Sequence, residues 1–144
     1  MSSTTTGRAS AASPGDPLTG QNGWTELQGC PLYTDDDFPR SVQQFEDIMA
    51  KTPNLDAFIP TGGFPQFIPD ANRAAVGKYK DKIAAKELAL VVADTLPVQI
   101  EQMKEGLSLG QVGQRPFEMG YKTMMALKDI NEGKAAPTDA TYTG

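Results

Sequence analysis

Hydrophobic and polar positions along the chain follow two different periods, which predicts strands and helices in turn. Residues 88–93, Leu-Ala-Leu-Val-Val-Ala, are continuously apolar, as is typical of a central parallel strand covered on both faces. Shorter strands are predicted at 26–33, 55–59 and 107–114, with a further candidate at 141–143. Apolar residues recur at helical spacing over about 39–51, 64–87, 97–106 and 116–132. This alternation predicts an α/β fold with a partial doubly wound, Rossmann-like parallel sheet.

Prolines and acidic residues mark where the predicted helices begin. The prolines that suit a first helical turn are Pro39, Pro97 and Pro116. The run Thr34–Asp37 offers N-caps for the first helix and lacks the spacing of a calcium loop, so no metal site is predicted there. Asp70 is predicted to cap the second part of helix 64–87, after a break near Pro69. The apolar surface of helix 97–106 is assigned to Val98, Ile100 and Met103.

The first 22 residues differ in composition from the rest of the chain. They are rich in Ser, Thr, Gly, Ala and Pro and contain no apolar core of a secretory signal. Such a composition predicts a leader without regular structure, followed by a folded domain over 23–144. No apolar run approaches the ~20 residues of a membrane span. Taken by itself, the chain is therefore predicted to be cytoplasmic.

Composition argues against several classes of function. A net charge of −5 over 144 residues, with no cluster of Lys and Arg, argues against a nucleic-acid partner. The chain has no His, the commonest general base and metal ligand, and its single Cys30 excludes an internal disulfide. The pair Gly62-Gly63 lacks the lysine and spacing of a phosphate loop. No catalytic residue, cofactor or metal is predicted, although a small nucleotide-dependent α/β enzyme stays as the enzyme alternative.

Five segments, taken in order, resemble the second half of a type I periplasmic sugar-binding protein, the ribose-binding kind of receptor that serves an ABC transporter. These segments are 52–58, 91–97, 103–106, 113–121 and 133–143. The resemblance implies one of two α/β lobes that close over a monosaccharide, without catalysis, in the periplasm and with a membrane permease as partner. It also implies a receptor truncated at both ends, in which the segment 115–133 crosses back to a lobe that this chain lacks.

Two polar residues follow predicted strands, where open α/β sheets bind their ligands. Asp94 ends strand 88–93, and the resemblance implies that its carboxylate accepts hydrogen bonds from sugar hydroxyls. The alternative is that Asp94 caps the next helix. Gln114 corresponds by resemblance to a hinge glutamine that contacts sugar, and the alternative is an exposed strand end. We expect Asp94 and Gln114 to open on one crevice.

The loop 61–64, Thr-Gly-Gly-Phe, stands where ribose-type receptors often place Asn-Asp. Gly63 and Phe64 are therefore the remaining candidates for ligand contact. The Phe64 ring suits stacking on the apolar face of a pyranose, and the alternative is core packing at the start of a helix.

Two further alternatives follow from the resemblance: the effector lobe of a sugar-responsive regulator, and a remnant that has lost its binding activity. The stripe that by resemblance packs on the missing lobe consists of Phe117, Tyr121, Met124 and Leu127. Contiguous apolar surface seldom stays exposed to water. We therefore expect helix 116–132 to mediate self-association or to fold back on its own sheet.

Overall fold

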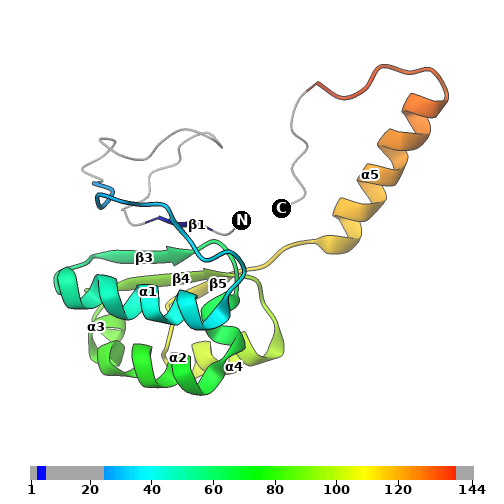
Figure 1. Cartoon of the computed structure of the whole chain (residues 1–144). Helices are drawn as coiled ribbons and strands as arrows, with labels where there is room; N and C mark the ends of the chain where they lie inside the picture. Colours follow the sequence, from blue (N-terminus) through cyan, green and yellow to red (C-terminus); the bar gives the residue numbers. More distant parts are fainter. Residues whose placement is uncertain (1–2, 6–24, 139–144) are drawn as a thin grey trace. The chain divides into compact units, whose positions relative to one another are not determined.

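The computed structural model describes residues 3–5 and 25–138 (Figure 1). It divides into a first unit, Met1–Val112, and a second unit, Gly113–Gly144, and each is described by itself. The strands of the first unit are β1 (Ser3–Thr5), β2 (Leu32–Tyr33), β3 (Ala57–Pro60), β4 (Ala89–Ala93) and β5 (Gly110–Val112). Its α-helices are α1 (Phe38–Lys51), α2 (Pro69–Val76), α3 (Lys80–Ala84) and α4 (Pro97–Lys104), with 3-10 turns η1 (Phe64–Phe67) and η2 (Gly77–Tyr79). The second unit holds α5 (Pro116–Asn131).

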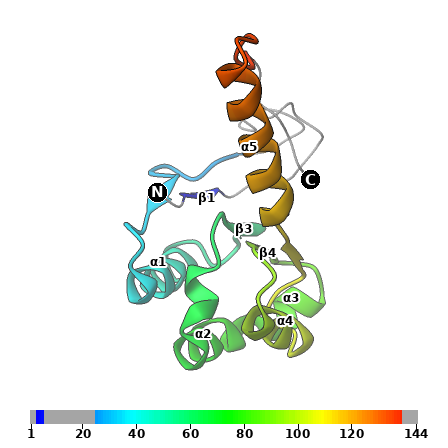
Figure 2. The same ribbon diagram turned by 90° about the vertical axis from the view of Figure 1, so that its right-hand side faces the viewer.

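The sheet of the first unit has the strand order β2-β1-β3-β4-β5. Strands β3, β4 and β5 are parallel, with Phe58 opposite Leu90 and Val92 opposite Gln111. Helices α1 to α4 lie on one face of this sheet (Figures 1 and 2). The predicted α/β fold with a partial parallel sheet is confirmed. Because β3, β4 and β5 are parallel, their carboxyl ends lie at the same end of the sheet, and this carboxyl edge carries the loops considered below.

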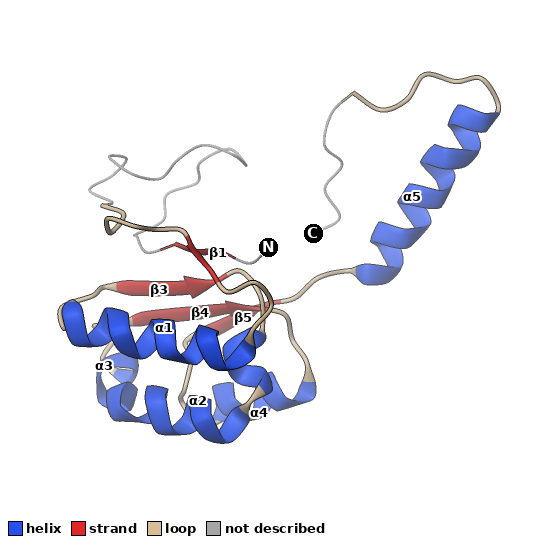
Figure 3. Ribbon diagram, in the orientation of Figure 1, coloured by secondary structure: helices blue, strands red, loops and turns tan. Residues whose placement is uncertain are grey.

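Strand β4 divides its apolar residues between the two faces of the sheet. Leu90 and Val92 are buried beneath the helices, whereas Ala89, Val91 and Ala93 are half-buried. Within the first unit the predicted cover on both faces is thus uneven, since its described helices, α1 to α4, supply only one layer (Figure 3). The helix side forms the core, where the rings of Phe45 and Phe58 meet edge to face, with centroids 5.1 Å apart.

Local signals explain where most helices begin and end. Asp37 is the N-cap of α1, and its carboxylate accepts the N–H of Arg40 at 2.8 Å, as predicted for this acidic run. The prediction that Asp70 caps α2 is wrong. Pro69 takes the first helical position, so the N-cap falls on Ile68 and Asp70 lies inside the first turn.

The amino-terminal prediction differs from the structure at three residues. Ser3–Thr5, expected to belong to a leader without regular structure, form β1 and pair antiparallel with both β2 and β3. The physical reason is the edge of β3, whose unpaired backbone groups offer a template to another strand. The rest of 1–22 and the candidate strand 141–143 lie outside the described residues.

The described part of the second unit, residues 113–138, contains the helix α5. Helix α5 begins at Pro116, as predicted, and none of its residues is buried. Phe117 is 82% exposed, and its ring stacks on that of Tyr121 with centroids 6.2 Å apart. The predicted apolar stripe is therefore exposed, and self-association through it stays a prediction. In the described ranges no helix combines the length and hydropathy needed to cross a membrane.

Candidate functional site

Asp94 lies one residue beyond β4, at the carboxyl edge of the parallel strands. Its backbone has φ 75°, in the left-handed region where Asp is one of the few tolerated side chains. Its N–H donates to the carbonyl of Val112 at 2.8 Å, and its Oδ2 accepts the N–H of Gly63 at 3.3 Å. The N-cap of α4 is Leu96, so the interpretation of Asp94 as the cap is wrong. Asp94 instead ties its own loop to the loop that follows β3.

Gly63 is buried at a point of close approach. A Cβ built on it would lie 2.7 Å from Nε2 of Gln99 and 2.7 Å from Cζ of Phe67, closer than real atoms stand. Its backbone, at φ −71° and ψ 4°, is open to any residue, so packing alone requires glycine here. This position of the loop therefore has no room for a side chain, and Gly63 can meet a ligand only through its main chain.

Phe64 is half-buried at the start of η1. Its ring stacks on that of Phe38, with centroids 5.6 Å apart and planes 21° from parallel, and meets Phe67 edge to face at 6.1 Å. Packing against these two rings thus explains the buried part of the Phe64 side chain. Stacking of its exposed part on a sugar stays a prediction.

Gln114 is exposed and belongs to the second unit, two residues after β5 ends. The structure brings Asp94 and Gly63 together in the first unit through their hydrogen bond, and Phe64 follows Gly63 directly in the chain. Because the two units are described separately, the crevice shared by Asp94 and Gln114 stays a prediction.

A cluster of side-chain amides packs against the loops at this carboxyl edge, and the pattern of apolar residues did not predict it. The cluster, here called the glutamine network, consists of Gln66, Gln99, Gln102 and Gln111. The first three are at most 1% exposed. Gln99 and Gln102 form the inward face of α4, while Val98, Ile100 and Met103 are only half-buried. The predicted helix does carry these three apolar residues, but its most buried side chains are the two glutamines.

The glutamine network binds main-chain groups of the site loops. Nε2 of Gln99 donates to the carbonyl of Ala93 at 2.8 Å and to Oε1 of Gln66 at 2.9 Å. With its amide turned so that both ends are satisfied, Gln111 donates to the carbonyls of Val92 and Asp94, each at 3.0 Å. Buried amides are stable only when paired in this way. The missed signal is the spacing of Gln99 and Gln102, three apart on one helix face.

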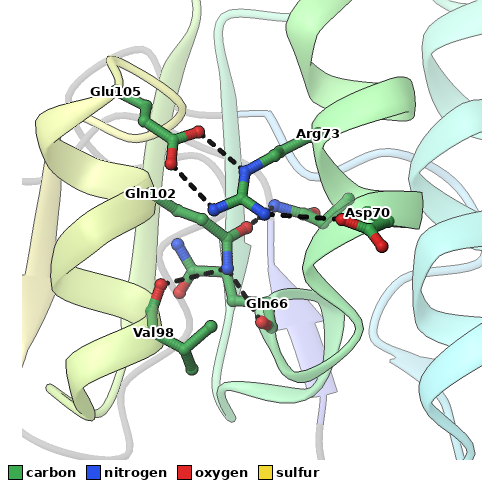
Figure 4. A network of polar contacts seen from close by, with 7 residues as sticks. Gln66, Asp70, Arg73, Val98, Gln102 and Glu105 are labelled. Atoms are coloured by element: carbon green, nitrogen blue, oxygen red, sulfur yellow. Dashed lines mark hydrogen bonds and ion pairs between the residues drawn. The ribbon is translucent and has the colours of Figure 1, made fainter.

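Beside this network, Arg73 of α2 clamps Glu105 after α4 (Figure 4). Its Nε and Nη2 donate to the two carboxylate oxygens, each at 2.8 Å, and Asp70 lies 3.5 Å from Nη1. These hydrogen bonds, with the positive charge of Arg73, lower the pKa of Glu105 below its ordinary value. The same contacts raise the pKa of Arg73.

We expect the contribution of this ion pair to depend on pH. A lowered carboxyl pKa adds stability that is present above the unfolded value, about 4.3, and is lost as the pH falls through the folded value. A Glu105→Gln variant should therefore melt slightly below wild type at pH 7, by an amount kept small because both side chains are over a third exposed. Melting curves from pH 7 to pH 3 should show the difference disappearing in acid. The exposed Glu87→Gln is the control, and a difference that persists in acid would contradict the assignment.

The chemistry of this edge is that of recognition by hydrogen bonds. A carboxylate at a strand end, a close loop and an aromatic ring suit a ligand with hydroxyl groups and an apolar face. Among the described residues no group of three His, Cys, Asp or Glu stands close enough to hold a metal ion. A pocket of about 390 Å³ in the first unit is lined by α1 and residues 27–32 and by none of the candidates.

Comparison with known proteins identifies the family of the fold. Residues 9–135 match the family described as periplasmic binding protein domain. The structure is similar to the crystal structure of GanP, a glucose-galactose binding protein from Geobacillus stearothermophilus, with a TM-score of 0.58 and 24% sequence identity. The match covers 74% of this chain and 36% of the GanP chain, so this chain spans about a third of that relative. None of the curated proteins compared matches it. With most of its length matched to the family, the chain belongs to the periplasmic binding protein domain family.

Proposed function

We propose that this chain forms part of the ligand-binding lobe of a monosaccharide receptor and catalyses no reaction. The observation that carries the proposal is the Asp94 carboxylate, which stands at the carboxyl end of a parallel strand and is bonded to Gly63 of the neighbouring loop. The family supports binding over catalysis, and the name of GanP states that the similar protein binds glucose and galactose.

The proposed recognition uses the acceptor capacity of Asp94. A carboxylate has about four lone-pair positions, so its oxygens accept from sugar hydroxyls as well as from the N–H of Gly63. Such charge-assisted bonds are roughly twice as strong as neutral ones. Phe64 supplies an apolar ring for stacking, and Gln114 supplies an amide that donates and accepts.

The proposal includes a protein partner and a cellular location for the receptor. A membrane permease of an ABC transporter is the proposed partner, and the periplasm is the proposed location. Both rest on the family to which the chain belongs.

Calorimetric titration of wild type and Asp94→Asn with galactose, glucose, ribose and ATP tests the proposal. Asn is chosen because it also tolerates the left-handed backbone at this position. Hydrogen bonds to charged groups contribute about 1.5–3 kcal/mol, so the variant should bind its monosaccharide at least about tenfold more weakly.

An exposed carboxylate on α3 provides the control, and Asp81→Asn should bind as wild type does. Thermal shift at high sugar concentration extends the measurement to millimolar affinities. Absence of monosaccharide binding by wild type, binding of ATP instead, or equal affinity in Asp94→Asn would each overturn the proposal.

A further inference from the structure

We infer that Gln99 is a positioning residue, which holds Asp94 and Gly63 in the arrangement that presents the Asp94 carboxylate at the edge of the sheet. The geometric part of this inference stands on contacts within the first unit. Its consequence for sugar affinity rests on the proposed function.

Gln99 contacts main-chain groups on both sides of Asp94. Its Oε1 accepts the N–H of Leu96 at 3.0 Å, and its Nε2 donates to the carbonyl of Ala93 at 2.8 Å. One side chain on α4 thus bridges the residue before Asp94 and the start of the helix after it. This bridge holds the short loop in which Asp94 adopts its left-handed backbone.

The same amide packs against the partner of Asp94. Nε2 of Gln99 lies where a Cβ on Gly63 would be only 2.7 Å away, so amide and glycine backbone are in direct contact. Nε2 also donates to Oε1 of Gln66, and the N–H of Gln66 donates to the carbonyl of Gly63 at 3.0 Å. Gln99 therefore fixes the loop after β3 by touching Gly63 and by binding the residue that closes its turn.

Gln102 offers a matched comparison on the same helix. It is equally buried, with 0% exposure for both side chains. Its Nε2 donates to the carbonyls of Gln66 and Val98, and its Oε1 accepts from Asn72 (Figure 4). These contacts lead to α2, to η1 and to the preceding turn of α4. Gln66 is thus shared by the two glutamines, but the contacts of Gln102 include neither Gly63 nor the residues on either side of Asp94. A purely structural role predicts the same result for both glutamines, whereas a positioning role separates them.

The test compares Gln99→Met with Gln102→Met, two replacements of similar length that remove both ends of the amide. Each variant should melt below wild type, because buried main-chain groups lose partners. Amide nitrogen–proton NMR spectra should show the Gly63 and Asp94 signals moved in Gln99→Met and nearly unmoved in Gln102→Met. Equal movement of these signals in the two variants would overturn the inference.

A measurement on the unmodified chain keeps the inference testable if Gln99→Met does not fold. The side-chain amide protons of Gln99 should show a nuclear Overhauser effect to the Hα protons of Gly63, with which they are in contact. They should also exchange slowly with solvent, because both are bonded and buried. Absence of the effect, together with fast exchange, would overturn the inference.

Sugar titration tests the effect of Gln99 on sugar affinity separately from its effect on the position of the loops. If wild type binds a monosaccharide, Gln99→Met should bind it about tenfold more weakly, and Gln102→Met should bind within about twofold of wild type. Equal affinities in the two variants would overturn the positioning role in binding. If wild type binds none, the proposed function fails, and the NMR comparison alone decides the geometric inference.

Discussion

A Phe58→Ala variant is expected to lose about 3–5 kcal/mol of unfolding free energy, the largest effect that we predict for a single substitution. Phe58 is 2% exposed on β3 and meets Phe45 of α1 edge to face. Truncation removes this aromatic pair and leaves a cavity between the sheet and its helix layer. Urea unfolding followed by circular dichroism measures the loss, which is a large part of the 5–15 kcal/mol typical of a domain.

Phe117→Ala provides the control for this experiment. Phe117 is 82% exposed on α5, so its truncation should change the unfolding free energy by no more than about 0.5 kcal/mol. Similar losses in the two variants would contradict the division between a packed first unit and an exposed α5.

A Gly63→Ala variant is expected to lose about 1–3 kcal/mol of stability, because the added methyl group overpacks the site. The new Cβ would stand 2.7 Å from both the Gln99 amide and the Phe67 ring. Chemical denaturation measures the stability, and the amide signal of Asp94 reports whether the loop shifts.

Gly77→Ala is the matched glycine substitution. Gly77 has a right-handed helical backbone, φ −55°, and nothing within 4 Å of an added Cβ. Alanine there should stabilise the chain by about 0.4–1 kcal/mol through the unfolded state. If both substitutions stabilise the protein, Gly63 is not at a close approach and the packing described for the loop is wrong.

Most of the fold could be predicted from signals that act within a few residues. Pro39, Pro97 and Pro116 lie in the first turns of α1, α4 and α5, and Gly106 and Gly133, both with positive φ, follow α4 and α5. The unbroken apolar run 88–93 predicted β4 because no polar residue interrupts it. Asp70 was assigned to the wrong position because two signals compete there, and Pro69 at the first helical position places the N-cap at Ile68, two residues before the acid.

The rest depends on partners that are distant in the sequence. β1 pairs with β2 and with the edge of β3, which is more than fifty residues away, and nothing within Ser3–Thr5 itself predicts these partners. Likewise, the run 88–93 shows that β4 is apolar but not how many helix layers cover it. Tertiary pairing of this kind is set by the whole sheet and not by local propensity.

The acidic residue of the candidate site could be predicted from the sequence, whereas the glutamines that hold its loops could not. Asp94 follows a strand, and a carboxylate at that place is a local and visible signal. Gln99 and Gln102 were not singled out, because Gln is mostly exposed in proteins and nothing nearby in the sequence marks these two as buried. Their burial follows from the carbonyls of Ala93 and Gln66, which need donors where the loops turn away from the sheet. Only the folded arrangement of the loops reveals that need.

The chemical type of the glutamine network has a consequence for the conditions in which the site keeps its shape. Amides gain and lose no proton over the ordinary range of acidity and carry no net charge for salt to screen. The hydrogen bond that Gln99 donates to Ala93 and the one that it accepts from Leu96 therefore hold equally at low or high salt and at acidic or neutral pH. The Arg73–Glu105 ion pair, by contrast, weakens as salt screens its charges and as acid protonates the carboxylate. The contacts of Gln99 with the loop around Asp94 are thus insulated from the medium, while the outer contact between α2 and the end of α4 responds to it.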